Sequence, residues 1–368
     1  MIRWRSAVVD KVRSQWPGAV EYDVTLASGD RVRALAYPDL VGLPEPGDEV
    51  LLNVSALERG LGTGGLALVI AVPGRLPDPA PDGLGHLVKA RYTPLQTMVL
   101  GVDEQESPHH EALRDADSLG GMPVVVADLH SALPAIVAGM REAIPDANVV
   151  YVMTDGGALP IAFSRTVAAL REAGWLGASV TVGQAFGGDA EAVNLHTGLL
   201  AAALVLRADV AVVSQGPGNL GTGTRWGFSG VAAGEAVNAA ATLGGRAVAS
   251  LRVSEADVRE RHRGLSHHSS TAYGRVALAA ADLPVPMLPG AFGSELLAAV
   301  RDLASASGGR LTLHEVDVTG LEAALAGSPA PLSTMGRGMA QDPASFLAAA
   351  AAGRHTARML TSEQAGGN

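Results

Sequence analysis

From residue 85 onward, short apolar runs alternate with longer segments of helical pattern. This alternation predicts an α/β fold, a doubly wound and mostly parallel sheet with helices on both faces. The runs are continuously apolar, as is typical of strands buried on both sides. We expect strands near Thr97–Val102, Pro123–Ala127, Val149–Met153, Ser179–Val182, Asp209–Ser214, Ala247–Val253 and Leu311–Val316. The expected helices are Ala132–Ala143, Ile161–Ala173, Glu191–Leu206 and Gly230–Leu243.

Residues 1–74 have a different pattern, in which short runs alternate between apolar and polar residues and turn residues separate them. Several short strands at this spacing predict a small N-terminal β-barrel. The Pro-rich segment 75–84 is interpreted as a linker. The α/β domain is then expected over residues 85–360, with residues 361–368 as a tail. The strands expected in the barrel are Glu21–Leu26, Arg31–Ala36, Glu49–Val54 and Ala67–Val72.

Composition excludes several classes of protein. With 48% hydrophobic and 17% charged residues in 368, the chain can bury a sizeable core. A net charge of −10 and 4% aromatic residues argue against nucleic-acid binding. The absence of cysteine excludes disulfides, thiolate nucleophiles and cysteine-ligated metal centres. Because Arg207 interrupts the apolar run Leu199–Leu206 and no signal peptide is evident, we expect a cytoplasmic protein without a membrane segment. A small, anionic molecule is the expected partner, and a homodimer is one alternative for the oligomeric state.

The cofactor stays unknown at this point. The chain has only two lysines, Lys11 and Lys89, and no P-loop motif, so P-loop nucleotide hydrolysis is excluded and pyridoxal chemistry is disfavoured. Residues Gly216–Gly221 fit the spacing of a dinucleotide-binding loop only weakly, because Pro217 stiffens the run and no acidic residue follows at the required distance. A divalent metal is kept as an alternative.

Polar residues gather directly after the expected strands. In a doubly wound sheet these positions meet at the carboxyl ends of the strands, where ligands bind. Each such loop also precedes a helix, whose free N–H groups favour anions. Helix capping by the aspartates and turn formation by the glycines are the structural alternatives. The residues concerned are Asp128, Asp155, Gly156 and Gly157.

The loop Gln215–Thr224 is rich in glycine and threonine. Its main-chain N–H groups and hydroxyls are suited to holding an anion. We assign this role to Gly216, Gly218, Gly221, Thr222 and Thr224.

The run Arg259–Ser270 contains three of the ten histidines and three arginines. We expect His267 or His268 to transfer protons as a general acid or base. Metal ligation by one of them, together with Asp128, His130 or Asp155, is a second interpretation, although no spaced metal motif supports it. A structural hydrogen-bond network is the third. We favour catalysis or ligand binding without a permanently bound transition metal, and assign no metal ligand.

Six phrases of the sequence stand out: Gly60–Gly65, Arg91–Gln96, Glu191–Asn194, Gln215–Thr224, Arg261–Ser269 and Ser333–Gly338. Taken together, they resemble an actinobacterial member of the uncharacterised family catalogued as domain of unknown function 3866. The resemblance covers nearly the whole chain and implies no activity. It does imply that the loop around Arg337 belongs to the globular unit. Where a threonine is expected after the histidine pair, this chain has Ser269, which retains the hydroxyl.

The resulting hypothesis is an enzyme that acts on a small anionic or phosphorylated metabolite by hydrolysis or group transfer. His267 or His268 transfers protons, and Asp128 or Asp155 orients a base or a water molecule. A non-catalytic ligand-binding or regulatory protein, with the barrel as an interaction module, is the alternative. The residues expected to bind the ligand, besides the glycine and threonine residues named above, are Arg252, Arg263, Arg337 and Asn194.

Overall fold

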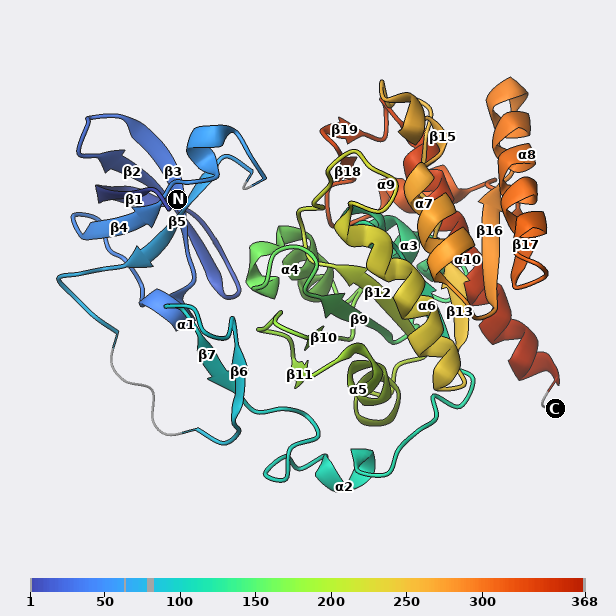
Figure 1. The fold of residues 1–368 in the computed structure, drawn as a ribbon, viewed down its shortest axis with the longest axis horizontal. Coiled ribbons are helices and arrows are strands. Elements are labelled where there is room, and N and C mark those ends of the chain that lie inside the picture. The colour runs from blue at the N-terminus through green and yellow to red at the C-terminus, as the bar shows by residue number, and fades with distance from the viewer. Residues whose placement is uncertain (1, 63, 78–82, 367–368) are drawn as a thin grey trace. The chain divides into compact units, whose positions relative to one another are not determined.

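The computed structural model in Figure 1 describes residues 2–62, 64–77 and 83–366. It divides into two compact units, one of Met1–Leu100 with Ala162–Ala168, the other of Gly101–Ile161 with Ala169–Asn368. Part of the expected linker, residues 78–82, and the end of the expected tail, residues 367–368, lie outside the described residues. Among the described residues, no helix has both the length and the apolar character needed to cross a bilayer.

The first unit contains a closed five-stranded barrel, as predicted, with the strand order β1-β2-β3-β5-β4. All neighbouring strands are antiparallel except β3 and β5. Side chains such as Tyr22, Val24 and Leu52 are fully buried and form its core. The one-turn helix α1 (Pro38–Val41) interrupts a region expected to hold only strands and turns. The barrel strands are β1 (Trp4–Trp16), β2 (Ala19–Leu26), β3 (Arg31–Ala36), β4 (Glu49–Asn53) and β5 (Leu66–Ala71).

A separate hairpin in this unit corrects one prediction. The segment Thr97–Val102, expected in the large sheet, forms the short strand β7 (Thr97–Val99), which pairs with β6 (Leu87–Lys89). The side chain of Met98 is 72% exposed, so this segment does not have the two buried faces of an interior strand.

The second unit contains an eight-stranded sheet in which all neighbouring strands are parallel, as predicted. The strand order is β11-β10-β9-β12-β8-β13-β16-β17. The central strands are mostly apolar and are buried on both sides. The strands are β8 (Pro123–Val126), β9 (Val149–Thr154), β10 (Ala178–Val182), β11 (Ala190–Ala192), β12 (Val210–Gln215), β13 (Arg246–Ala249), β16 (Ala281–Pro286) and β17 (Leu311–Val316).

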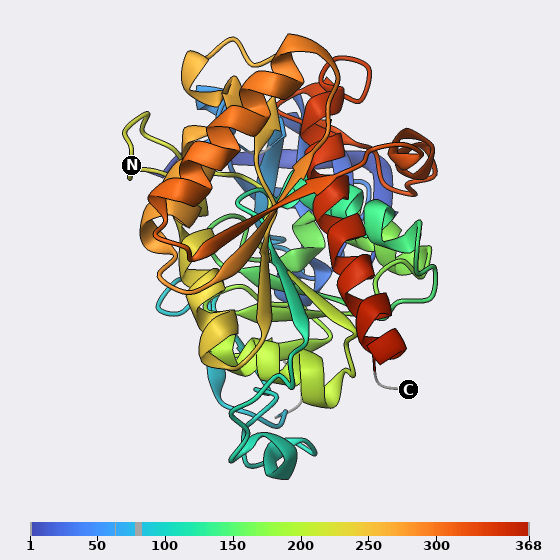
Figure 2. The same cartoon turned by 90° about the vertical axis from the view of Figure 1, so that its right-hand side faces the viewer.

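Helices cover both faces of this sheet (Figures 1 and 2). On one face lie α3 (Leu133–Arg141), α9 (Leu321–Ala326) and α10 (Pro343–Gly366). On the other lie α5 (Leu195–Leu200), α6 (Ala232–Thr242), α7 (His267–Thr271) and α8 (Gly290–Ala306). Helix α10 continues through Gly366, so residues 361–366 of the expected tail are helical.

Helices α3 and α10 pack closely because each contributes a glycine at the contact. A Cβ atom on Gly139 would lie 2.0 Å from the carbonyl oxygen of Ala350, and one on Gly353 would lie 1.9 Å from that of Ile136. The residues Ala348–Ala352 are buried almost completely. Small side chains therefore let the two backbones approach each other closely.

The chain leaves β8 and β12, which are adjacent, in opposite directions. After β8 it forms α3 and goes on to β9 on one side of the sheet, whereas after β12 it forms α6 on the other face and goes on to β13. The loops that follow the two strands diverge at their carboxyl ends. Such a switch point is where open α/β sheets bind ligands.

Candidate functional site

The loops after β8 and β12 are joined at the switch point by polar side chains. Gln215 donates from Nε2 to the carbonyl oxygen of Asp128 at 3.0 Å and to Oδ1 of Asn219 at 2.8 Å. The same Oδ1 accepts from the hydroxyl of Ser229 and from the N–H of Gly230. A Cβ atom on Gly230 would lie 2.9 Å from the Cβ of Asp128, so this glycine permits the close approach of the two loops.

Tyr273 joins the loops that follow β8 and β13. It lies in a π-helical turn, Ala272–Val276, that continues α7, and its side chain is fully buried. Its hydroxyl is 2.9 Å from the carbonyl oxygen of Val126 and 3.1 Å from that of Ser250. Two residues beyond each of these carbonyls stand Asp128 and Arg252. The tyrosine thus fixes the backbone that carries this acidic and basic pair.

Asp128 is the buried acidic residue of the site. Only 4% of its surface is exposed, and its Oδ2 lies 3.1 Å from Nδ1 of His268 and 3.6 Å from Nη1 of Arg252. Burial acts to raise the pKa of this carboxyl, but the hydrogen bond with His268 and the charge of Arg252 outweigh burial and lower the pKa below its ordinary value. Asp128 is therefore ionised at neutral pH.

His268 is held on several sides. Its Nδ1 lies 2.9 Å from Nη1 of Arg252 as well as 3.1 Å from Asp128, so the proton on this nitrogen decides which of the two is its hydrogen-bond partner. The ring of Phe228 stacks on the imidazole with a centroid distance of 3.7 Å and an interplanar angle of 8°. The hydroxyl of Ser269, the conservative departure noted in the sequence, accepts from the backbone N–H of Arg252 at 2.9 Å.

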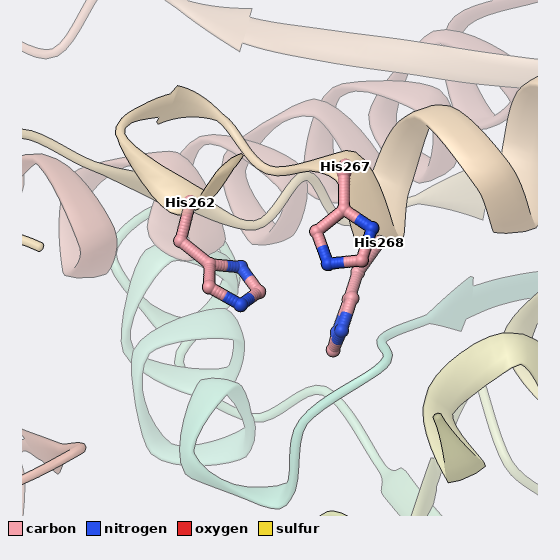
Figure 3. Close-up of side chains that lie close together, drawn as sticks. All are labelled: His262, His267 and His268. Atoms are coloured by element: carbon pink, nitrogen blue, oxygen red, sulfur yellow. The ribbon is translucent and has the colours of Figure 1, made fainter. Parts of the chain in front are cut away.

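Three imidazole rings gather where α7 begins (Figure 3). His262 comes from the preceding loop and places Nδ1 2.8 Å from the hydroxyl of Ser266, which also caps the helix by accepting from the N–H of His268. Ring centroids are 4.9 Å apart for His262 and either other ring, and 4.5 Å apart for His267 and His268. We call His262, His267 and His268 the histidine cluster.

Burial and nearby positive charge keep two rings of the histidine cluster neutral. Burial is the main cause that lowers the pKa of His262 to about 3, and the charge of Arg252 acts in the same direction. Burial likewise lowers the pKa of His267 to about 4, with contributions from His268 and from Arg261. Both rings are unprotonated at pH 7 and are therefore able to accept a proton or a metal ion.

A small cavity of about 30 Å³, enough for one or two water molecules, adjoins Asp128 and Arg252. Arg337 also lines it. Its guanidinium pairs with Asp342 at 3.1 Å and with Asp257 at 3.2 Å. Arg337 therefore ties the C-terminal loop to the site while its charge is balanced by two buried carboxylates.

Four of the predicted site residues contact a neighbouring loop or cap a helix. Asp155 is exposed and accepts from the N–H of Gln184 at 2.9 Å, and Asn194 caps α5 by accepting from the N–H of Thr197. Gly156 and Gly157 lie against the loop after β12, because Cβ atoms there would meet Gln215 and Gly216 at 2.6 and 2.2 Å. These loops do share the carboxyl edge of the sheet.

The Gly/Thr-rich loop uses several of its own polar groups internally. The N–H of Gly216 donates to the carbonyl of Thr154, and the hydroxyls of Thr222 and Thr224 bond to each other and to the backbone of Gly227. The other two glycines expected to hold an anion, Gly218 and Gly221, are exposed.

Arg263 was predicted to bind the ligand, but the arginine that lies near the histidine cluster is Arg261. Both are exposed, but Arg261 extends to within 4.0 Å of the Cβ position of Gly223, and its charge acts on His267. His130, considered as a metal partner, instead places Nδ1 3.0 Å from the hydroxyl of Tyr151.

Sequence reasoning missed Phe228, Ser266 and Gln215. In a chain with few aromatic residues, a phenylalanine next to a glycine at the end of a polar loop was a usable signal, and so was Ser266 at the start of a helix. Gln215 ends an apolar strand, and nothing in the sequence shows that its Oε1 is buried without a hydrogen-bond partner among the described residues.

Comparison with known proteins places the chain in a family and adds no activity. A search of curated proteins and a search of solved structures found no match. A family model described as protein of unknown function (DUF3866) matches residues 33–353. The chain belongs to this family.

Proposed function

We propose that the protein is an enzyme that acts on a small anionic substrate by hydrolysis or group transfer at the carboxyl edge of its parallel sheet. The observation that carries this proposal is the contact of His268 with the buried carboxylate of Asp128, beside Arg252, at the switch point between β8 and β12. Buried carboxylate and imidazole pairs of this kind are common in catalytic sites, where the carboxylate orients the ring.

The positive charge around the histidine cluster supports an anionic substrate. Arg252 stands within the site, and Arg261 stands exposed at its rim, close to His267 and to the Gly/Thr-rich loop. An arginine donates charge-assisted hydrogen bonds to phosphate or carboxylate. We assign the first contact with the substrate to Arg261 and the stabilisation of the bound anion to Arg252.

Water is the nucleophile that fits the site best. The hydroxyl of Ser266 has the distance to His262 expected of a serine and histidine pair, but it is fully buried and serves as the cap of α7. His267 is partly exposed, and its Nε2 has no hydrogen-bond partner among the described residues. An unprotonated imidazole in this position is suited to activating a water molecule.

The test combines binding and turnover. The thermal unfolding of the full chain is measured with inorganic phosphate, pyrophosphate, phosphate monoesters and diesters, and small carboxylates. Each compound that raises Tm is then assayed for phosphate or acid release. The proposal expects at least one compound that is turned over, with binding weakened by Arg261→Gln. The control Arg114→Gln, which also removes an exposed arginine, leaves binding unchanged.

The alternative is a ligand-binding protein without catalysis. It is favoured by the burial of Ser266 and by the pairing of Arg337 with two carboxylates, both of which give the site a structural character. Stabilisation that depends on Arg261 without turnover of any compound supports this alternative. If no compound binds in a way that depends on Arg261, both the enzyme and the ligand-binding protein are overturned. A location in the cytoplasm, expected from the sequence, remains part of the proposal.

A further inference from the structure

The histidine cluster brings three ring nitrogens close together without any hydrogen bond between the rings. One nitrogen from each of His262, His267 and His268 lies within 4.8 Å of the other two. Figure 3 shows the three rings turned toward a common space beside the start of α7. Nitrogens that share a tetrahedral zinc ion are about 3.4 Å apart, given bonds of about 2.1 Å. The side chains must therefore rotate to bring the nitrogens from within 4.8 Å to that spacing.

The hydrogen bonds around the cluster leave one nitrogen of each ring free to bind. His262 uses Nδ1 toward Ser266, and His268 uses Nδ1 toward Asp128 and Arg252, so Nε2 is the remaining nitrogen of both rings. His267 has a buried Nε2 without a hydrogen-bond partner among the described residues. A buried polar atom without a partner costs free energy and calls for an explanation. A bound cation supplies one.

A second group, Asp282, His314 and His355, also has ligand atoms within 4.8 Å of one another. There the Nε2 atoms of His314 and His355 lie 3.1 and 2.8 Å from the carboxylate of Asp282, although that of His314, like that of His267, is buried without a hydrogen bond among the described residues. The difference is the acidic partner, because no salt bridge in the described part of the chain reaches His267. We therefore take the histidine cluster as the metal site and the second group as its control.

We propose that His262, His267 and His268 bind one divalent cation of the zinc class through three imidazole nitrogens, with a fourth position open to water or to an anion. Three histidines with an open position are a known ligand set for zinc. Asp128 and Ser266 then occupy the positions of outer partners that fix the tautomer and orientation of ligating imidazoles. The preference for a metal-free site, drawn from the sequence, is thereby revised.

The metal site stands on geometry alone, whereas its chemical use rests on the proposed function. A zinc ion lowers the pKa of its bound water to about 7, which provides the nucleophile that a hydrolase needs at neutral pH. His267 then acts as a ligand rather than as the base that activates water, and His268 acts as a ligand oriented by Asp128. Arg261 at the rim and Arg252 within the site remain available to contact an anion at the open position.

The experiment uses the full chain, freed of metal by a chelator and dialysed. Zn²⁺ is titrated by calorimetry, and Co²⁺ is titrated while its visible absorption is recorded, because a tetrahedral cobalt centre absorbs strongly. We expect one equivalent of each ion to bind. His267→Gln should weaken zinc binding at least 100-fold, and circular dichroism and Tm in chelator should show that the variant is folded. His262→Gln is the second ligand variant. His314→Gln is the control and should bind zinc like the unaltered chain.

Each outcome bears on the inference in a definite way. It is overturned if neither ion binds, or if His314→Gln rather than His267→Gln abolishes binding. It is also overturned if both ligand variants are folded and bind zinc with unchanged affinity. Turnover by the metal-free chain supports the proposed function and refutes the use of the metal, whereas metal binding that depends on His267 without turnover supports the site and refutes the proposed function.

Discussion

The carboxylate of Asp128 and the imidazole of His268 stand 140 positions apart in the chain and 3.1 Å apart in the fold. Asp128 follows β8. His268 lies in the first turn of α7, which follows β13 and the small hairpin of β14 (Val253–Ser254) and β15 (Gly264–Leu265). Their contact connects the loops of two adjacent parallel strands. The carboxylate of Asp128 also balances the charge of Arg252. Among the described residues, no other acidic side chain forms a salt bridge with this arginine.

Replacing Asp128 with asparagine should destabilise the protein, because a neutral amide leaves the buried Arg252 without a counter-charge. A loss of about 1–3 kcal/mol in the free energy of unfolding is expected. Urea unfolding at pH 7 measures it. Asp115→Asn is the control, since Asp115 pairs with Arg114 on the surface, and its effect should stay within about 0.5 kcal/mol. Equal effects for the two variants would show that Asp128 is not a structural counter-ion.

Acid should destabilise the metal-free protein through buried His130. Burial lowers the pKa of this ring to about 4, against 6.5 for an exposed histidine. Between those values the unfolded chain binds more protons than the folded one, so stability is complete above pH 6.5 and falls as the pH drops toward 4. This group accounts for up to about 3 kcal/mol. His262 and His267 act in the same direction.

The variant His130→Gln separates this effect from other acid-labile groups. Urea unfolding in the presence of a chelator at pH 7, 6, 5 and 4.5 should give a shallower decline for the variant than for the unaltered chain. The carboxyl of Asp128, whose pKa is lowered, titrates at lower pH and contributes little in this range. Parallel declines for the two proteins would show that His130 is not the group responsible.

The alternation of strands and helices, and the candidate site residues after the strands, could be predicted from local sequence patterns, whereas the order of the strands and the contacts within the candidate site could not. Continuous apolar runs predicted most of the parallel sheet, and the polar residues that follow those runs identified Asp128 and the loop after β12. Strand β16 was missed because it contains Pro284 and Pro286, which are rare in interior strands. It tolerates them because its only residue pair with β13 is Asp282 with Val248, before both prolines.

Within the site, the sequence gives residue types but not their partners. The threonines of the Gly/Thr-rich loop were expected to face a ligand, yet their hydroxyls bond within the loop, since the turn at Gly227 brings them together. Arg261 and Arg263 are equivalent in the sequence, and only the path of the chain around the short hairpin before α7 determines which one reaches His267. The stacking of Phe228 on His268 likewise depends on the crossing of two distant loops.

Adding one methyl group between α3 and α10 should destabilise the α/β unit. In an exposed helix, replacing glycine with alanine stabilises by about 0.5–1 kcal/mol. At Gly139 the new Cβ would lie 2.0 Å from the carbonyl oxygen of Ala350, so the helices must separate, and Gly139→Ala should cost about 1–3 kcal/mol. Gly327→Ala, where the nearest atom is 3.4 Å away, should change stability by less than about 0.5 kcal/mol. A stabilising effect of Gly139→Ala in thermal unfolding would contradict this account of the packing.

Two adjacent serines provide a test of how Arg252 is positioned. Ser269 is fully buried, and its hydroxyl accepts from the backbone N–H of Arg252 at 2.9 Å, whereas the hydroxyl of Ser270 makes a long contact of 3.5 Å within its own helix. Ser269→Ala leaves that N–H without a partner and should cost about 1–3 kcal/mol in urea unfolding. Ser270→Ala should cost less than about 0.5 kcal/mol. Because Arg252 carries the charge beside Asp128 and His268, Ser269→Ala should also weaken the binding of any anion that stabilises the unaltered chain. Similar stability and anion binding in the two variants would show that Arg252 is positioned by its side-chain contacts alone.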